Sequence, residues 1–425
     1  MSDAVYRIRG GVPLHGPVAI SGAKNAAMPC MAAALLTSEP CTLHNVPAIG
    51  DVDLFANILQ HLGVLVEFSA GRHSLTIQAA GPLNDSPPTH LVVNQRASFL
   101  VMGPLLARLG RGACAAPGGD VIGQRPLDVH LHGFSALGAT VEQRGGRFLA
   151  TADRLRGSRV VLEYPSVLGT ENLLLAAARA EGRTTIVNAA AEPEVVCLAE
   201  MLSKMGAQIR GAGAHTIEID GAPALHGVDH TLIPDRIEAG TFAVAAAITG
   251  GDLVLRGAQP RHLDALLFKL REIGVEIEER PESIRVRANG PLAATTIQAV
   301  PYPGLATDLQ ALVATLLTQA HGVSVVNERV FESRLQYVGE LRKLGALIVT
   351  AAGTTAIIQG PTPLHGTLVR GLDVRASAAL VLAGLVAQGE TELLDLMHLE
   401  RGYECLDLKL RSLGADVVRV AAPRE

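Results

Sequence analysis

The hydrophobic pattern of this 425-residue chain repeats six times. Each repeat contains apolar residues at helical spacing, then a glycine, then alternating apolar and polar residues, as in HLGVLVEF and KMGAQIRG. The glycines follow one another at intervals of 68 to 75 residues and are Gly63, Gly138, Gly206, Gly274, Gly345 and Gly414. This pattern predicts an amphipathic helix that ends at a glycine and leads into a strand.

A second helical segment precedes each of these and is apolar on nearly every side. The six segments are NAAMPCMAAALL, ASFLVMGPLLARLG, NLLLAAARA, GTFAVAAAITGG, LQALVATLLTQAHG and ASAALVLAGLVAQG. A helix that is apolar all round is buried, and each of these is too short to cross a bilayer. We therefore predict an α/β protein of six βαβαββ-like repeats, three per domain, with helices inside and sheets outside.

Charged and polar residues gather where the buried helices are expected to start. They are Lys24-Asn25, Arg96, Thr170-Glu171-Asn172, Asp235-Arg236, Asp308 and Arg375. A helix start offers free N–H groups and a partial positive charge, so it attracts anions. A cation there opposes the helix dipole unless an anion binds beside it. If the repeats are equivalent, these starts converge on one anion site. N-caps at Asp235 and Asp308, and surface ion pairs for the cations, are the alternatives.

Composition and charge narrow the class of protein. Apolar residues make up 48% of the chain and the net charge is −5, which does not favour a nucleic acid or an acidic membrane as partner. The N-terminus lacks a secretory signal and the longest apolar run, Ala26 to Leu36, is too short for a membrane span, so we expect a cytoplasmic protein. The five cysteines are scattered and never spaced as CxxC. We therefore expect no disulfide framework and no metal site, and because the sequence has no cofactor fingerprint we expect no cofactor.

A glycine-rich loop, APGGDVIGQRPLDVH, covers residues 116–130. It matches neither a Walker A loop nor a dinucleotide-binding fingerprint, and a surface turn is the alternative interpretation. Arg125 lies where a mobile flap would bring a cation onto a bound anion.

Several segments together resemble a known family. They are SGAKNAAMP, RAS at Arg96, PGGDVIGQRPLDVH, PDRIEAGTF, TDLQA at Asp308, VFESR, DVRASA and ERGYE. In order and spacing they resemble the UDP-N-acetylglucosamine 1-carboxyvinyltransferases, which are enolpyruvyl transferases, over essentially the whole chain. The resemblance implies a two-domain inside-out α/β barrel. Residues 24–233 would form the first domain, carrying the catalytic loop 116–130. Residues 1–23 plus 234–425 would form the second, with the active site in the cleft between the two.

The implied reaction adds the 3-hydroxyl of UDP-N-acetylglucosamine to C2 of phosphoenolpyruvate and then expels phosphate, as the first committed step of peptidoglycan synthesis. Both substrates are anions, so arginines and lysines must bind them. The resemblance assigns Lys24, Arg125 and Arg401 to the phosphate, Arg334 and Arg375 to the carboxylate, and Asn25 to the intermediate.

Two proton transfers are required, one from the hydroxyl and one to C3 of phosphoenolpyruvate. Asp308 matches the family's base. The loop acid of the family is usually a cysteine, whereas this chain has Asp120, as a minority of the family does; Cys114 does not fill that position. The antibiotic fosfomycin alkylates the loop cysteine, and a carboxylate is a poorer nucleophile toward its epoxide. We therefore predict intrinsic fosfomycin resistance.

The resemblance also marks residues on the nucleotide-sugar side. They are Arg96, Arg125, Pro126, Leu127, Asp128, Val129, Tyr164, Pro165, Ser166, Val167, Asp308 and Val330, with Asp128 placed to accept a hydrogen bond from uracil. Two positions depart from the family pattern. Leu168 begins Leu-Gly-Thr where most members have Gly-Ala-Thr, and Ala191 stands where an arginine is usual.

These departures leave alternatives open. The first is a paralogous enolpyruvyl transferase that acts on another nucleotide or nucleotide sugar in secondary metabolism. The shikimate-pathway relative is a second, but the RPLDVH loop argues against it. A catalytically silent binding protein is a third, disfavoured because Lys24, Asp308, Arg375 and Arg401 are all present. The sequence leaves the oligomeric state open, a monomer included.

Overall fold

The protein is described by a computed structural model that covers residues 4–421 and divides into two compact units. Gly22–Gly119 and Arg125–Ile233 form unit 2. Unit 1 contains the chain up to Ser21, the chain from Pro234 onward, and Asp120–Gln124 from the glycine-rich loop. The chain therefore passes between the units four times, after Ser21, Gly119, Gln124 and Ile233.

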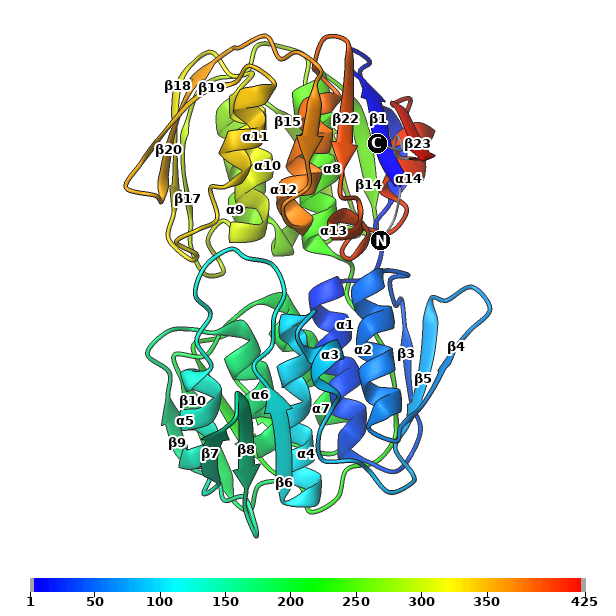
Figure 1. Cartoon of the computed structure of the whole chain (residues 1–425), viewed down its shortest axis with the longest axis vertical. Helices are drawn as coiled ribbons and strands as arrows, with labels where there is room; N and C mark the ends of the chain where they lie inside the picture. The colour runs from blue at the N-terminus through cyan, green and yellow to red at the C-terminus, as the bar shows by residue number, and fades with distance from the viewer. Residues whose placement is uncertain (1–3, 422–425) are drawn as a thin grey trace. The chain divides into compact units, whose positions relative to one another are not determined.

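Unit 2 contains three of the predicted repeats (Figure 1). The first consists of α1 (Lys24–Ala33), β3 (Cys41–His44), α2 (Gly50–His61), β4 (Leu65–Phe68) and β5 (Ser74–Gln78). The second consists of the 3₁₀ helix η2 (Arg96–Val101), α4 (Met102–Leu109), β6 (Arg111–Ala115), α5 (Asp128–Ala136), β7 (Thr140–Arg144), β8 (Arg147–Thr151) and β9 (Arg159–Val161). The third consists of α6 (Val167–Ala177), β10 (Arg183–Val187), α7 (Pro193–Lys204), β11 (Gln208–Arg210), β12 (Thr216–Asp220) and β13 (Val228–Thr231).

Unit 1 contains the other three repeats. The fourth consists of α8 (Arg236–Thr249), β14 (Asp252–Arg256), α9 (Asp264–Ile273), β15 (Glu276–Arg280), β16 (Ser283–Arg287) and β17 (Thr296–Ala299). The fifth consists of α10 (Thr307–Leu317), β18 (Gly322–Glu328), α11 (Tyr337–Lys343), β19 (Leu347–Ala351), β20 (Thr355–Gly360) and β21 (Leu368–Arg370). The sixth consists of α12 (Val374–Gly384), β22 (Glu390–Leu394), α13 (Met397–Glu400), α14 (Leu406–Ser412) and β23 (Asp416–Ala421), and it is completed by β1 (Ala4–Arg9) and β2 (His15–Ala19) from the start of the chain.

The strands of residues 4–421 form six separate sheets, three in each unit. Five of them have four strands, and each of these combines an antiparallel set with one parallel strand that comes from another repeat of the same unit. The pairs β17–β18 and β21–β22 are examples. The sixth sheet, β6-β8-β7, has three strands. The predicted α/β arrangement is confirmed, and the described strands do not close into one continuous barrel.

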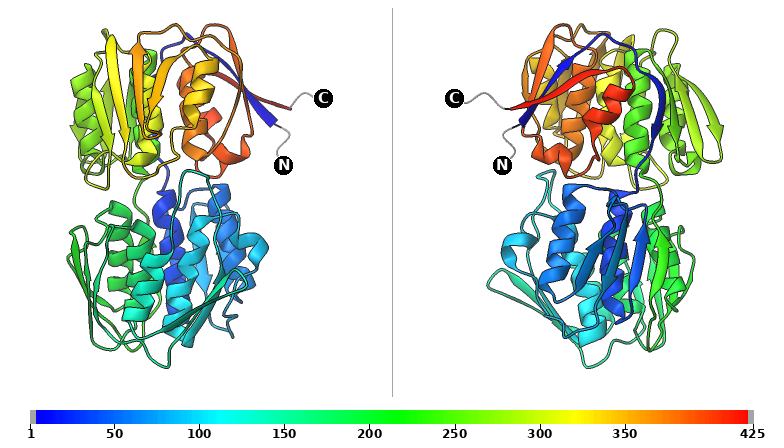
Figure 2. Two further views of the ribbon diagram at one scale, coloured as in Figure 1. Left: turned by 60° about the vertical axis from the view of Figure 1, so that its left-hand side comes forward. Right: turned by 90° about the vertical axis from the view of Figure 1, so that its right-hand side faces the viewer.

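The predicted buried helices form the core of each unit. In unit 1, α10 packs against both α8 and α12, and the sheets lie around them (Figure 2). In unit 2, α4 packs against α6, and α1 packs against α7. Alanine-rich faces allow such helices to approach closely and fill the interior without large aromatic side chains. Among the described residues, none of the helices combines the length and the apolar character that a membrane crossing requires.

The six glycines that punctuate the sequence all adopt a left-handed conformation at the end of their helices. Their φ angles lie between 93° and 116°. Such angles are unfavourable for residues with a Cβ atom, which explains why glycine recurs at this place. The prediction of a glycine-terminated helix is confirmed for every repeat.

Two helix starts differ from the prediction. Arg96 opens a 3₁₀ helix, and α6 already begins at Val167. Thr170, Glu171 and Asn172 are therefore fully buried inside α6 and do not lie at its start. Asn172 accepts from the N–H of Gly103 at 2.8 Å, so its role there is to join two buried helices.

Candidate functional site

Asp308 lies in the first turn of α10 and is held by two arginines. Arg334 donates from Nη2 to Oδ1 at 2.7 Å, and Arg375, in the first turn of α12, donates from Nε to Oδ2 at 3.0 Å. The side chains of Arg334 and Arg375 are only 5% and 3% exposed. Asp308 is not an N-cap, because no side chain caps α10. Asp235 caps α8 by accepting from the N–H groups of Ile237 and Glu238, so the capping interpretation is correct there.

Arg375 has two further donor nitrogens that do not bond to Asp308. Its Nη1 and Nη2 are buried and have no hydrogen-bond partner among the described residues. The guanidinium lies over the ring of Tyr403, 5.1 Å from the centroid. Tyr403 in turn shares a 2.7 Å hydrogen bond with Thr241 on α8. Buried donors without an acceptor are costly, so this guanidinium is suited to bind an oxyanion.

Glu328, at the end of β18, positions Arg334. Its Oε1 accepts from the N–H groups of Val330 and Phe331, at 2.7 and 3.1 Å. Its Oε2 accepts from the hydroxyl of Thr307 at 2.7 Å, and the same hydroxyl oxygen accepts from Arg334 Nη1 at 3.0 Å. Glu328 is 1% exposed, so these contacts are shielded from water. It thereby fixes the loop that carries Val330 as well as the arginine that holds Asp308.

We expect Glu328→Ala to lower the free energy of unfolding by about 2–4 kcal/mol, because it leaves the partly buried N–H groups of Val330 and Phe331 without an acceptor. Glu328→Gln keeps one acceptor oxygen and should lose less than half as much. Urea unfolding of the three proteins measures both values. An unfolding free energy for the alanine variant equal to that of the parent chain would show that these contacts do not stabilise the loop.

The centre of the glycine-rich loop packs on unit 1. Arg401 Nη1 lies 3.4 Å from Asp120 Oδ1. Glu332 accepts from the N–H of Gln124 at 2.6 Å, and this hydrogen bond lowers the pKa of Glu332. Gly123 adopts a φ of 149°, and a Cβ there would lie 2.5 Å from the Glu332 carboxylate. Glycine at 123 therefore permits the close approach that seats Asp120 beside Arg401.

In unit 2, Lys24 is the first residue of α1, and its ammonium group lies 2.8 Å from Asp51 Oδ2. The Asp51 side chain is 3% exposed and that of Lys24 is 13% exposed. Asn25 follows it and is partly buried. The cation at this helix start therefore has a protein anion as neighbour, which the sequence did not reveal.

Arg96 and Arg125 form a second cationic group in unit 2. Burial, with a further contribution from the charge of Arg125, lowers the pKa of Arg96 to about 10. Arg96 Nη2 donates to the carbonyl of Pro126 at 3.3 Å. Because the charge of Arg125 contributes to the lowered pKa of Arg96, an anion bound beside the two arginines would offset their repulsion.

The two expected nucleotide segments, 125–129 and 164–167, lie next to each other. Ser166 caps α6 by accepting from the N–H of Gly169. A Cβ on Gly169 would lie 2.6 Å from Val129 Cγ1, so this glycine allows the two segments to touch. Asp128 is the first residue of α5, and Tyr164 is 42% exposed.

Leu168 and Ala191, the two residues that depart from the family pattern, both belong to unit 2. Leu168 is partly buried and packs against the hydrophobic core of this unit. Ala191 is 5% exposed. Nearby Glu171 is fully buried, and burial together with the charges of Glu194 and Glu192 raises its pKa well above the ordinary value. Ala191 therefore lies in the protein interior, and Leu168 lies at the edge of the hydrophobic core.

His130 ends the glycine-rich loop motif and is buried on α5, where its Nδ1 lies 3.1 Å from Asn172 Nδ2. Burial, followed by the charge of Arg96, lowers its pKa to about 3. The folded chain therefore keeps His130 neutral, whereas the unfolded chain binds a proton below about pH 6.5. Its contribution to stability is fully present above pH 6.5 and is lost as the pH falls toward 3.

We expect the free energy of unfolding to fall by about 2–3 kcal/mol because of His130 when the pH is lowered from 6.5 to 4.5. The loss should be absent in His130→Gln and retained in His226→Gln, where an exposed histidine is replaced. Urea titrations at several pH values measure the slope for each protein. Identical slopes for the parent chain and His130→Gln would show that His130 binds its proton equally well in the folded state.

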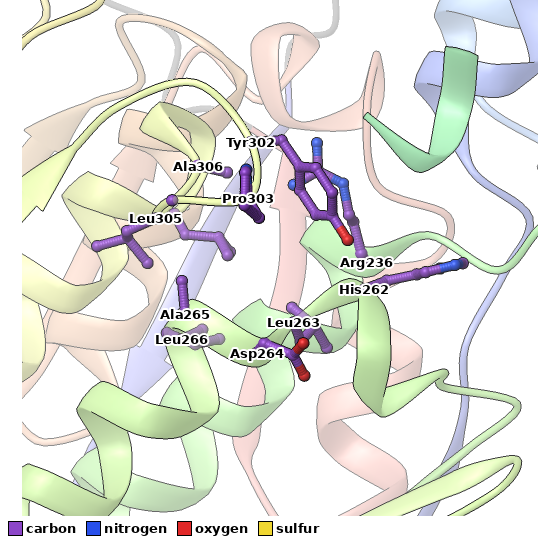
Figure 3. A pocket seen from close by; sticks show the side chains of 12 residues that line it. Arg236, His262, Leu263, Asp264, Ala265, Leu266, Tyr302, Pro303, Leu305 and Ala306 are labelled. Atoms are coloured by element: carbon purple, nitrogen blue, oxygen red, sulfur yellow. The ribbon is translucent and has the colours of Figure 1, made fainter. Parts of the chain in front are cut away.

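A small pocket in unit 1 lies at the starts of α8, α9 and α10 (Figure 3). Arg236 extends over the ring of Tyr302, 5.6 Å from its centroid, beside His262, Asp264 and Leu305. Burial, followed by the charges of Arg261 and Arg236, lowers the pKa of His262 to about 4. The pocket has room for about one water molecule, so it is no substrate site by itself.

Comparison with known proteins assigns the family. The family model described as EPSP synthase (3-phosphoshikimate 1-carboxyvinyltransferase) matches residues 8–410. The UDP-N-acetylglucosamine 1-carboxyvinyltransferase of Koribacter versatilis is 49% identical over 417 residues, which is 98% of this chain and 96% of that protein. UDP-N-acetylglucosamine 1-carboxyvinyltransferase 1 of Staphylococcus aureus strain MRSA252 is 47% identical, covering 97% of this chain and 98% of that protein. The chain belongs to the UDP-N-acetylglucosamine 1-carboxyvinyltransferase family.

Membership in this family makes the chain a transferase and confirms the resemblance identified from its motifs. Its fold is also that of a solved relative. The enolpyruvyl transferase NikO from Streptomyces tendae superposes with a TM-score of 0.89 at 28% identity, and the match covers 100% of both chains.

The structure groups the expected site residues by unit. In unit 1 it brings together Asp308, Arg334 and Arg375, and it pairs Asp120 with Arg401. In unit 2 it places Arg96 beside Pro126. Supporting residues that were not found from the sequence are Asp51, Thr307, Glu328 and Tyr403. Thr307 and Tyr403 had a signal, because they lie within the TDLQA and ERGYE motifs.

Proposed function

We propose that this chain transfers the enolpyruvyl group of phosphoenolpyruvate to the 3-hydroxyl of UDP-N-acetylglucosamine and releases phosphate. Identities of 47% and 49% to transferases named for this sugar nucleotide, over nearly their full lengths, support the proposal. The structural observation that carries it is the carboxylate of Asp308 fixed by two buried arginines, one of which has two donors to spare. That arrangement combines a base with an anion-binding group.

Phosphoenolpyruvate brings a phosphate and a carboxylate, and each needs its own cations. Arg375 and Arg334 would bind the carboxylate, and the two unpartnered nitrogens of Arg375 suit a bidentate contact. Lys24, Arg125 and Arg401 would bind the phosphate. Because Lys24 and Arg125 belong to unit 2 and the others to unit 1, residues of both units would serve one reaction.

The proton transfers would use two carboxyl groups. Asp308 would take the proton of the sugar 3-hydroxyl while the hydroxyl oxygen attacks C2 of phosphoenolpyruvate. Asp120 would deliver a proton to C3, and Asn25 would hydrogen-bond to the tetrahedral intermediate. Arg401 lies beside Asp120. A phosphate bound to Arg401 would offset the positive charge of the guanidinium and allow Asp120 to act in its protonated form. Loss of a C3 proton and of phosphate then yields the enol ether.

The nucleotide would lie against the adjoining segments 125–129 and 164–167. Asp128 would accept from uracil, and Pro126, Leu127, Val129, Tyr164, Pro165, Ser166 and Val167 would form the surrounding surface. Arg96 would lie near the diphosphate sugar and Val330 near the sugar ring. Because phosphoenolpyruvate and sugar nucleotides are cytosolic metabolites, we place the reaction in the cytoplasm, at the entry to peptidoglycan synthesis.

The competing proposal is an enolpyruvyl transferase for a different nucleotide. Two observations disfavour it. Leu168 packs against the hydrophobic core of unit 2 and Ala191 is buried, so packing within this unit accommodates both departures. The relatives named for UDP-N-acetylglucosamine are also 47% and 49% identical to this chain over nearly their full lengths.

Phosphate release from phosphoenolpyruvate, measured with one acceptor at a time, tests the proposal. We expect release with UDP-N-acetylglucosamine, and at least about a hundredfold lower kcat/KM with UDP-glucose, UMP or shikimate 3-phosphate. Preference for a free nucleotide would establish the paralogue instead. Asp308→Asn serves as the blank for contaminating phosphatase activity.

A further inference from the structure

Two cysteines and a histidine that serve none of the roles above meet inside unit 2. Cys30 lies on α1, Cys197 on α7 and His230 on β13. Their exposed fractions are 0%, 1% and 2%. The two sulfur atoms and a ring nitrogen all lie within 4.8 Å of one another, with His230 Nε2 3.3 Å from Cys197 Sγ. All five cysteines are free, and the scattered spacing in the sequence gave no sign that two of them meet.

The hydrogen bonds around this group give Cys197 the character of a thiolate. Lys204 Nζ lies 3.4 Å from His230 Nδ1, and an ammonium group can only donate, so Nδ1 is the acceptor. The ring proton is then on Nε2, which donates to Cys197 Sγ. The sulfur of Cys30 lies within 4.8 Å of the Cys197 sulfur. The hydrogen bond from Cys30 and that from His230 lower the pKa of Cys197, although burial opposes them.

Burial alone does not give a cysteine this character, as two other cysteines show. Cys114 and Cys41 are each 0% exposed. Burial raises the pKa of Cys114 to about 12 and that of Cys41 to about 11. They provide internal controls for the reactivity of a buried thiol that lacks a donor such as His230.

A metal ion fits this arrangement less well than a thiolate does. A metal at Nε2 would require the ring proton on Nδ1, where it would point at the ammonium group of Lys204. The observed contacts direct one ring nitrogen of His230 to the Cys197 sulfur and the other to Lys204. They leave Nε2 no lone pair for a ligand bond.

We propose that Cys197 and Cys30 form a peroxide-sensitive dithiol that is oxidised to a disulfide between α7 and α1. The Cys197 thiolate attacks one oxygen of hydrogen peroxide, the O–O bond breaks, and Cys197 sulfenic acid and hydroxide form. The Cys30 sulfur then attacks the sulfenic sulfur, its proton leaves with the departing oxygen as water, and the S–S bond forms. Each sulfur gives one electron of the two that reduce the peroxide. The sulfur atoms must close from at most 4.8 Å to about 2.0 Å.

Peroxide treatment of the full chain tests this site without reference to enzyme activity. The exposed Cys405 is first replaced by serine to prevent links between molecules. After treatment the protein is denatured, its free thiols are alkylated and its peptides are mapped by mass spectrometry. We expect two of the four remaining thiols to be lost, in one linked pair of peptides that carries Cys30 and Cys197. Cys41 and Cys114 should stay fully alkylated.

Two variants separate the steps. Cys30→Ser should stop at the sulfenic acid of Cys197, which dimedone captures, whereas Cys197→Ser should leave Cys30 reduced. Oxidation of Cys114 or Cys41 as fast as Cys197 would overturn the proposal, because burial would then set the reactivity. It would also be overturned by recovery of both thiols after peroxide, or by one equivalent of zinc in the isolated chain that disappears in Cys197→Ser.

Discussion

Asp308→Asn is expected to lower kcat by about 10²–10⁴-fold while leaving the affinity for UDP-N-acetylglucosamine within a few-fold of the parent value. Asparagine has the shape of aspartate and retains an acceptor oxygen for Arg334 or Arg375, but it cannot take a proton from the sugar hydroxyl. Steady-state kinetics and titration calorimetry give the two quantities. A kcat within tenfold of the parent would remove Asp308 as the base.

The structure shows why alanine is a less suitable substitution at this position. Asp308→Ala leaves two nearly buried guanidinium groups without their counter-charge, which should destabilise the fold by about 3–5 kcal/mol. Loss of activity would then mix chemistry with unfolding. Asp235→Asn is the matched control, because Asp235 caps α8 and asparagine caps equally well. Its kcat should stay within a few-fold of the parent.

Asp120 is expected to determine the response to epoxides. The parent chain should keep its activity after incubation with micromolar fosfomycin, because a carboxylate is a weak nucleophile toward the epoxide carbon. Asp120→Cys should remain active and become irreversibly inactivated, with one fosfomycin added per chain. Asp120→Asn, which has no proton to deliver, should lose about 10²–10⁴-fold in kcat.

Mass spectrometry of the treated proteins locates the label. Cys114 lies six residues before Asp120 but is fully buried, so Cys114→Ala should not change the sensitivity of the Asp120→Cys protein. Inactivation of the parent chain with a label on Asp120 would contradict the expectation. So would an Asp120→Cys protein that turns over normally and resists the drug.

The repeat architecture could be predicted because it depends on local pattern. An amphipathic helix that ends at Gly63 or Gly345 is visible in about ten residues, and the left-handed φ at both positions is the reason that glycine is there. The buried helices could also be predicted, since α8 and α12 are apolar on nearly every side. The order of strands in the sheets could not be predicted, because strands such as β2 and β14 pair across more than 200 residues of sequence.

The candidate site could be predicted only where a motif marked it. Asp235 and Asp308 look alike in the sequence, each near the start of an apolar helix, yet one caps its helix and the other holds two arginines. Lys24 and Asp51 are 27 residues apart with nothing between them to signal an ion pair. Glu328 acts through the hydroxyl of Thr307, a contact that depends on how β18 ends beside α10. Tertiary packing, which the sequence pattern does not encode, determines these pairings.

The most direct test of the account is the reaction itself in heavy water. Phosphoenolpyruvate and UDP-N-acetylglucosamine are incubated with the chain in D₂O, and the product is analysed by proton NMR and mass spectrometry. Addition of a proton at C3 followed by its loss predicts an enol ether that carries deuterium at its vinyl CH₂, formed in equal amount with phosphate. A product without vinyl deuterium, or phosphate released without an enol ether, would contradict the account.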